Sequence, residues 1–175
     1  NNPHIPGFYC HSTSFRDEEN PIEGRHDLIF PMFEFETHGN IEALLRLETD
    51  LLLYLGFTGL ENRKIFQHVP YAKMAEHLGV KEITGEHENR IWKEFGYNAF
   101  FLKYFPQYTS PFWNMKKVGD YANKVDVILY GMETIGSAER STDPEEMRYL
   151  FHTISNGMYA EELYKKLGKE RIEQA

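Results

Sequence analysis

One segment decides the fold of this chain: residues Ser14 to Glu36 read SFRDEENPIEGRHDLIFPMFEFE. Two stretches in which apolar and polar residues alternate flank a charged loop that contains Asn20-Pro21 and Gly24. Alternation with a period of two is typical of strands, and Pro and Gly mark the turn between them. The segment therefore predicts a long β-hairpin.

The hairpin brings together residue types that suit a nucleoside triphosphate. Side chains alternate between the faces of a strand, so we expect Arg16 and Glu18 to share one face of the first strand. Arg25 and His26 lie in the loop, and Phe30 opens the return strand. An arginine fork pairs with phosphate, and an aromatic ring can stack on a base. A simpler alternative is a surface hairpin with an aromatic core face and a solvated charged loop.

This pattern resembles motif 2 of the class II aminoacyl-tRNA synthetases, which combines an Arg-x-Glu strand, an Arg-His loop and a return strand opened by Phe. The resemblance implies that Arg16 holds the α-phosphate of ATP, while Arg25 and His26 hold the outer phosphates. It further implies that Phe30 stacks on adenine and that Glu18 contacts the nucleotide or the acceptor end of a tRNA. Arg16 and Glu18 are then the expected catalytic residues.

A second segment, Lys124 to Arg140, reads KVDVILYGMETIGSAER and begins with the alternation of a strand. Asp126 and Glu133 are seven residues apart, which on a regular strand would place them on opposite faces. Gly131 can host a bulge or bend that brings them together. Two converging carboxylates near a triphosphate suit Mg²⁺. The alternative is a buried strand with an exposed acid, a turn and an arginine near a helix start.

The second segment resembles the stretch before motif 3 in the aspartyl and asparaginyl synthetases. In that subgroup an Asp and a Glu hold Mg²⁺ and an Arg meets the amino acid side chain. Asp126, Glu133 and Arg140 stand at these positions with the family spacing. The resemblance implies ATP and Mg²⁺ as cofactors and aspartate or asparagine as substrate. Residues Phe105–Lys116 resemble a Pro-Phe-aromatic strand pair of the same subgroup, so the resemblance spans residues 6–157.

The chain also departs from the family pattern. Ile29 stands where family members carry a Glu just before the stacking Phe. Motif 1, which builds the family's dimer interface, would precede residue 1. Motif 3 would follow near the C-terminus, where Gly168–Arg171 lacks its flanking glycines. We therefore expect residues 1–175 to be a single partial catalytic domain, excerpted from a longer, homodimeric enzyme.

Composition agrees with one domain that has a real core. The chain has 175 residues, is 41% hydrophobic and carries a net charge of −8. That charge argues against a broad nucleic-acid-binding surface but leaves room for a local contact with a tRNA acceptor end. The single cysteine, Cys10, excludes an intrachain disulfide and suits the cytoplasm. No run is long enough for a membrane span, so no membrane partner is expected.

Four further stretches predict helices. An apolar stripe runs from Ile41 to Leu55, and a short helix is expected between Pro70 and Gly79. Another is expected from about Gly85 to Phe95, and Asp143-Pro144 is a strong helix start. Strands and helices do not alternate regularly, so the fold class expected is α+β, an antiparallel sheet flanked by helices. The resemblance implies the same class II core.

The expected chemistry is ATP-dependent activation of aspartate or asparagine to an aminoacyl-adenylate, which makes the protein a ligase. Three alternatives for the function of the protein are open. A tRNA ligase would pass the aminoacyl group to tRNA, whereas a paralogue resembling archaeal asparagine synthetase-related proteins would pass aspartyl-adenylate to ammonia. The third is a non-catalytic binding module, which Ile29 favours.

Overall fold

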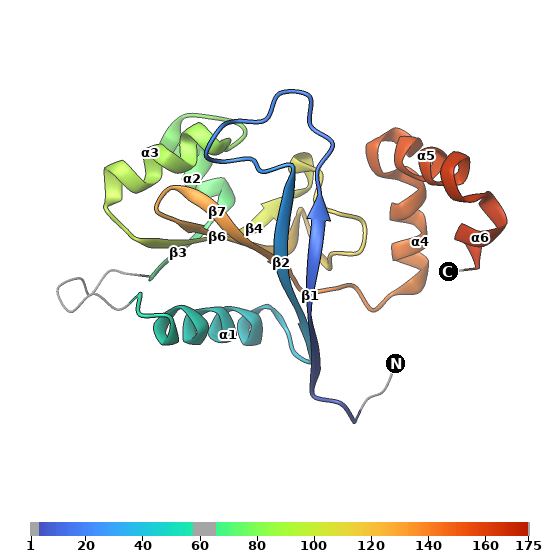
Figure 1. Cartoon of the computed structure of the whole chain (residues 1–175), viewed down its shortest axis with the longest axis horizontal. Coiled ribbons are helices and arrows are strands. Elements are labelled where there is room, and N and C mark those ends of the chain that lie inside the picture. Colours follow the sequence, from blue (N-terminus) through green and yellow to red (C-terminus); the bar gives the residue numbers. More distant parts are fainter. Residues whose placement is uncertain (1–3, 58–65, 175) are drawn as a thin grey trace. The chain divides into compact units, whose positions relative to one another are not determined.

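The computed structural model describes residues 4–57 and 66–174 of the chain (Figure 1). It divides into two compact units, Asn1–Asn40 and Ile41–Ala175. The single domain expected from the sequence stays a prediction, and each unit is described by itself.

The first unit is the predicted hairpin. Strand β1 (Gly7–Phe15) pairs antiparallel with β2 (Ile29–Thr37), in a register that runs without a shift from Gly7 opposite Thr37 to Phe15 opposite Ile29. A two-stranded ladder of nine residues a side is long for a hairpin.

One detail of the expected hairpin is wrong. Arg16 and Glu18 do not lie on the first strand, because β1 ends at Phe15. A last ladder-like hydrogen bond joins the Arg16 amide to the Leu28 carbonyl oxygen (2.8 Å). Beyond it the chain reads Asp-Glu-Glu-Asn-Pro, residue types that are depleted in strands, so the loop begins earlier than the alternation suggested.

The second unit is built on a five-stranded sheet. Strand β6 pairs with β4 on one side, and on its other side with β5 and then with β7. Strand β3 pairs with the other side of β4. All pairs are antiparallel except β3 with β4, which is parallel. The strands are β3 (Phe66–Pro70), β4 (Ala99–Pro106), β5 (Lys117–Val118), β6 (Tyr121–Leu129) and β7 (Met132–Ala138). The α+β class with a mainly antiparallel sheet is confirmed.

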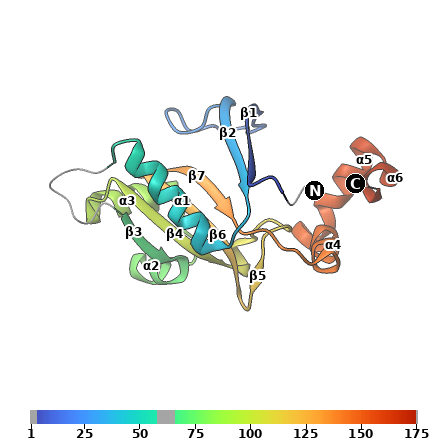
Figure 2. The same ribbon diagram turned by 90° about the horizontal axis from the view of Figure 1, so that it is seen from below.

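Helices cover both faces of this sheet (Figure 1). Helix α1 (Ile41–Tyr54) lies over β4 and β6 on one face (Figure 2) and shares a core cluster with both strands. Helices α2 (Tyr71–Leu78) and α3 (Gly85–Phe95) pack on the other. Phe101 of β4 belongs to the first core and Phe100 to the second, as the alternation of a strand requires.

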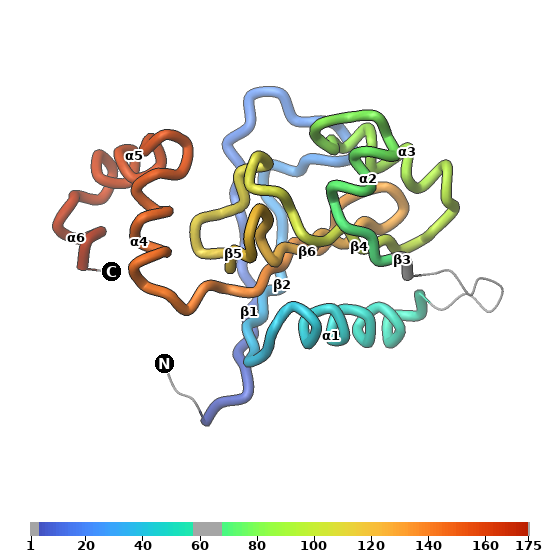
Figure 3. Tube along the Cα trace, turned by 180° about the vertical axis from the view of Figure 1, so that it is seen from behind, coloured from blue at the N-terminus to red at the C-terminus, as the bar shows by residue number. Residues whose placement is uncertain are grey.

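The helix boundaries follow the predicted signals. Gly79 ends α2 in the left-handed conformation (φ 71°), which glycine adopts at no steric cost. Asp143 caps α4 (Pro144–Thr153), since its carboxylate accepts hydrogen bonds from the amides of Glu145 and Glu146. Helices α5 (Met158–Leu167) and α6 (Lys169–Glu173) complete the chain (Figure 3). None of the described helices is long and apolar enough to span a bilayer.

Candidate active site

In the hairpin unit, four of the five residues expected to bind ATP form a chain of contacts. The Glu18 carboxylate lies 3.6 Å from an Arg16 guanidinium nitrogen and 2.8 Å from His26 Nδ1. The Arg16 guanidinium lies 5.4 Å from the centre of the Phe30 ring. Glu18 therefore links the arginine and the histidine, and Arg16 links this pair to the aromatic ring.

Arg25 and His26 belong to the turn of the loop. Both amides donate to the Ile22 carbonyl oxygen, at 3.0 Å and 2.8 Å. These two hydrogen bonds hold the backbone of Arg25 and His26 in the turn. The roles of Arg25 and His26 at the outer phosphates stay a prediction.

The hairpin cluster can bind an anion. The Arg16 side chain is 44% exposed and carries five N–H donors, while its described ion pair is a single contact of 3.6 Å. A phosphate that approached from solvent would meet a fork that is already held in place by Glu18 and Phe30. The cluster has the chemistry for a phosphate, and Phe30 offers an aromatic surface beside it.

In the sheet unit, a tight turn and a β-bulge decide which side chains of the second segment share a face. Tyr130 and Gly131 form a tight turn between β6 and β7, and both have positive φ (50° and 83°), as two-residue hairpin turns favour. Val127 pairs with Ile135 but the next pair is Ile128 with Glu133, so Thr134 is an extra residue on β7. Gly131 thus supplies the bend and Thr134 supplies the bulge, which the sequence had placed near Gly131.

The two-residue turn at Tyr130 and Gly131 brings Asp126 and Glu133 to the same face, because it pairs Glu133 with Ile128, which shares the face of Asp126 on β6. A Cβ added to Gly136 would lie 3.1 Å from Glu133 Oε1 and 3.8 Å from Asp126 Oδ1. Both carboxylates therefore stand over this glycine, and a side chain at position 136 would fill the space between them. The convergence that the sequence predicted is present, and the turn that contains Gly131 is its cause.

Asp126 lies in an environment that disfavours its charge. It is 6% exposed, Oδ2 accepts a hydrogen bond from Lys124 (2.6 Å), and Oδ1 has no hydrogen-bond partner among the described residues. Burial raises the pKa of Asp126 to about 7; Lys124 opposes this rise, and the negative charges of Glu133 and Glu88 add to it. Glu88 also accepts a hydrogen bond from the Glu133 amide (3.1 Å).

The carboxylate pair fits a magnesium ion that also binds phosphate. Within residues 4–57 and 66–174, no group of three or more His, Cys, Asp or Glu side chains is arranged to hold a metal. Mg²⁺, however, commonly takes one or two protein carboxylates and completes its shell with phosphate oxygens and water. The unpartnered Oδ1 of Asp126 is a buried acceptor that such an ion would satisfy. The metal role of Asp126 and Glu133 stays a prediction.

Arg140 lies on the same face as the carboxylates. Past the bulge, side chains alternate from Gly136 and Ala138 of β7 to Arg140, which lies beyond the end of the strand and forms an isolated antiparallel bridge with Met115. Its guanidinium Nη1 donates to the Asn114 side-chain oxygen (2.7 Å). Asn114 was not singled out from the sequence, because its partner is 26 positions away and no local pattern joins the two.

Glu139 points the opposite way, toward α1. Its carboxylate accepts hydrogen bonds from the Ile41 amide at the start of α1 (3.0 Å), from Asn123 Nδ2 (2.8 Å) and from Lys116 Nζ (2.7 Å). Burial on its own would raise the pKa of Glu139, but these hydrogen bonds and the Lys116 charge lower it overall. Glu139 is therefore an anion that joins β7 to three other parts of the unit.

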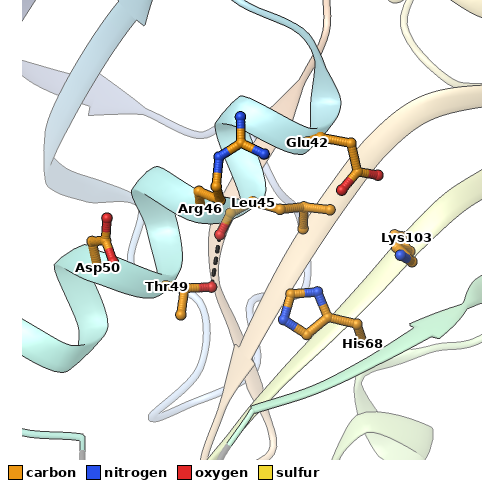
Figure 4. A pocket seen from close by; sticks show the side chains of 7 residues that line it. All are labelled: Glu42, Leu45, Arg46, Thr49, Asp50, His68 and Lys103. Carbon is orange, nitrogen blue, oxygen red and sulfur yellow. Dashed lines mark hydrogen bonds between the residues drawn. The ribbon is translucent and has the colours of Figure 1, made fainter.

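A separate pocket of about 200 Å³ lies between α1 and the strands β3 and β4 (Figure 4). It is lined by Glu42, Leu45, Arg46, Thr49, Asp50, His68 and Lys103. His68 stacks on Phe101 (ring centres 4.3 Å apart), and burial, aided by the Lys103 charge, lowers its pKa. This pocket is on the α1 face of the sheet, and none of the residues expected from the sequence to form the active site lines it.

Comparison with known families matches residues 5–170 to the family described as tRNA synthetases class II (D, K and N). A comparison with curated protein sequences gives no match.

Three solved structures share the fold. The aspartyl-tRNA synthetase of Entamoeba histolytica matches with a TM-score of 0.72 at 19% identity, over 92% of this chain and 40% of its own. The asparaginyl-tRNA synthetase of the same organism, in complex with asparaginyl-adenylate, matches with a TM-score of 0.68 at 21% identity, over 94% of this chain and 45% of its own. A putative aspartyl-tRNA synthetase from Leishmania major Friedlin matches with a TM-score of 0.72 at 14% identity, over 91% of this chain and 45% of its own. The chain thus spans less than half the length of each of these proteins.

Proposed function

This chain belongs to the class II tRNA synthetases of the D, K and N type, and on that premise we propose that it takes part in the ATP-dependent activation of aspartate or asparagine. In this reaction a carboxylate oxygen of the amino acid attacks the α-phosphorus of ATP. A new oxygen–phosphorus bond forms, the bond to the β-phosphate oxygen breaks, and the products are an aminoacyl-adenylate and pyrophosphate.

The observation that carries the proposal is the common face of Asp126, Glu133 and Arg140. A carboxylate pair that can bind a metal and a guanidinium that can bind an acidic or amide side chain come from one hairpin. The turn at Tyr130 and Gly131 puts Asp126 and Glu133 on one side of the hairpin, and the bulge at Thr134 brings Arg140 to the same side. A structural hairpin has no need of this arrangement, whereas a site for a metal–phosphate complex and a polar amino acid does.

The residues of the chain act by binding and orientation. Arg16 holds the α-phosphate, and Arg25 and His26 hold the outer phosphates. Phe30 packs on the adenine, and Glu18 keeps Arg16 and His26 in place and contacts the nucleotide or the acceptor end of a tRNA. Because the attacking group belongs to the substrate, no side-chain nucleophile is required, and the barrier falls through positioning and charge neutralisation.

Asp126 and Glu133 would hold Mg²⁺ between them. The ion, when bound, neutralises charge on the phosphates and on the departing pyrophosphate. Arg140 binds the side chain of the amino acid. We place the reaction in the cytoplasm, in a homodimeric enzyme that passes the aminoacyl group to tRNA.

A second candidate, a binding module without catalysis, is favoured by one observation. Ile29, at the start of β2, is 63% exposed and apolar where a Glu was expected from the family. A site that lacks this polar contact can retain nucleotide binding and lose the geometry for reaction.

Pyrophosphate exchange into ATP tests the proposal, measured on the native protein with each amino acid in turn. We expect exchange with aspartate or asparagine, and we expect Arg140→Leu to abolish it. Exchange with another amino acid but neither of these would contradict the subgroup assignment. ATP binding without exchange for any amino acid would establish the binding module instead.

A further inference from the structure

We propose that Asn114 is a specificity-determining residue that, together with Arg140, selects the side-chain carboxylate of aspartate over the amide of asparagine. The inference rests on the proposed function, because it takes Arg140 as the group that meets the substrate side chain. It goes further in naming one substrate and a residue that decides between the two.

The contact between the two residues fixes the orientation of the asparagine amide. Arg140 Nη1 lies 2.7 Å from the Asn114 side-chain oxygen. A guanidinium has only donors, so the oxygen of the amide and not its nitrogen must face it. The backbone holds the pair in place as well, since the Ser141 amide donates to the Asn114 carbonyl oxygen (2.9 Å) and Arg140 bridges to Met115.

The oxygen of Asn114 faces Arg140, so apart from the second lone pair of that oxygen Asn114 offers donors. The amide nitrogen carries two N–H groups, and the guanidinium keeps four of its five. Among the described residues, none accepts a hydrogen bond from these groups. Arg140 is exposed and Asn114 half-buried, so the pair presents a cationic surface of donors.

A surface of donors discriminates between the two candidate substrates. The carboxylate of aspartate only accepts hydrogen bonds and carries the opposite charge, so both of its oxygens can be satisfied. The amide of asparagine is uncharged and would direct its own N–H donors at the donors of the pair. A site that leaves polar groups unpaired rejects the wrong substrate strongly.

Glu139, the neighbouring acceptor that could have favoured asparagine over aspartate, points away from Arg140. Glu139 is next to Arg140 in the sequence, and its carboxylate could have received the amide N–H groups of asparagine. It lies on the opposite side of β7, where it accepts from Ile41, Asn123 and Lys116. Glu139 therefore positions the strand and does not read the substrate.

The test compares aspartate with asparagine in pyrophosphate exchange on the native protein, as the ratio of their kcat/KM values. The wild type should prefer aspartate. Asn114→Asp, which has nearly the same shape, places an acceptor and a negative charge against Arg140. We expect this variant to lower the ratio about 100-fold, mainly through a higher KM for aspartate. Asn156→Asp makes the same chemical change at an exposed position between α4 and α5 and should leave the ratio unchanged.

Asn114→Ala, which removes the amide without adding charge, keeps the test decisive if Asn114→Asp does not fold. It should lower the ratio about tenfold, the effect of one hydrogen-bonding group to a charge. A wild type that prefers asparagine, or a ratio unchanged in the folded Asn114 variants while Arg140→Leu abolishes exchange, would overturn this inference and leave the proposed function standing. Absence of exchange with both amino acids in the wild type would instead refute the proposed function.

Discussion

The two hairpins of this chain hold their candidate functional residues in different ways. In the β1–β2 hairpin the ladder is regular, and Arg16, Glu18 and His26 lie beyond the strand end, where side chains hold one another. In the β6–β7 hairpin, Asp126 and Glu133 lie within the strands on a face that the two-residue turn sets, and a bulge in the ladder adds Arg140 to that face. The first arrangement depends on side-chain contacts and the second on backbone register. Side-chain truncation should therefore damage the first hairpin, and changes of chain length should damage the second.

The largest effect is expected from deletion of Thr134. Without the extra residue the ladder becomes regular, and either Glu133 or Arg140 must turn to the opposite face. Pyrophosphate exchange should fall on the order of 1000-fold, because the metal ligands and the guanidinium no longer act on one substrate. Circular dichroism and thermal melting would establish that the variant is folded.

Thr134→Ala is the matched control for this deletion. It keeps the bulge residue and removes only the hydroxyl that donates to the Met132 carbonyl oxygen (3.1 Å). Activity within a few-fold of wild type is expected. If the folded deletion variant were as active as this control, backbone register would not govern the second hairpin.

A second effect concerns the support behind β7. Glu48 of α1 is fully buried against the sheet, and burial raises its pKa to about 7, with Ser137 of β7 only partly opposing the rise. The Ser137 hydroxyl donates to the Val125 carbonyl oxygen (3.4 Å). Because the folded-state pKa lies above the unfolded value of 4.5, the folded protein binds more protons between pH 4.5 and 7. Through Glu48, the free energy of unfolding should therefore fall by up to about 3 kcal/mol as the pH rises from 4.5 to 7.

Glu48→Gln should remove the contribution of Glu48 to this fall, since the amide is neutral at every pH, and leave the contribution of Asp126, whose pKa burial also raises to about 7. Urea unfolding at pH 5 and pH 8 would show the variant more stable than wild type at pH 8, with a much smaller difference at pH 5. Asp50→Asn, on the exposed side of the same helix, should leave the pH dependence as in wild type. An identical pH dependence in wild type and Glu48→Gln would mean that Glu48 is not the group responsible.

The smallest of these effects is a test of the first hairpin. Arg16→Ala should weaken ATP binding by about 2 to 3 kcal/mol, because it removes a charge-assisted contact with phosphate. Calorimetry with the native protein measures the affinity directly. Arg46→Ala, an exposed arginine on α1, is the control and should bind ATP as wild type does. Equal affinity in Arg16→Ala would remove Arg16 from the phosphate site.

Features with local signals in the sequence could be predicted. The hairpin turn, the helix that ends at Gly79 and the Asp143 cap each depend on a few adjacent residues, whose conformational preferences are strong enough to be read directly. The convergence of Asp126 and Glu133 was also predicted, from a bend at Gly131, although their odd spacing on a regular strand would have placed them on opposite faces.

Features that depend on pairing between distant segments could not be predicted. The bulge at Thr134 follows from how β7 aligns with β6, and nothing in the residues around it distinguishes this position from its neighbours. The parallel pairing of β3 with β4 and the contact of Asn114 with Arg140 join residues that are more than 20 positions apart. The side of the strand that Glu139 occupies likewise follows from its contacts with Ile41, Asn123 and Lys116, which are distant from it in the sequence.

The central claim is that Asp126 and Glu133 hold one magnesium ion together. A double-mutant cycle tests it most directly, with Asp126→Asn, Glu133→Gln and the double variant compared in pyrophosphate exchange over a range of Mg²⁺ concentrations. If the two carboxylates share an ion, each single variant should need more Mg²⁺, and the double variant should lose little more activity than the weaker single variant. Losses that add fully, with an unchanged Mg²⁺ requirement in each single variant, would contradict the claim.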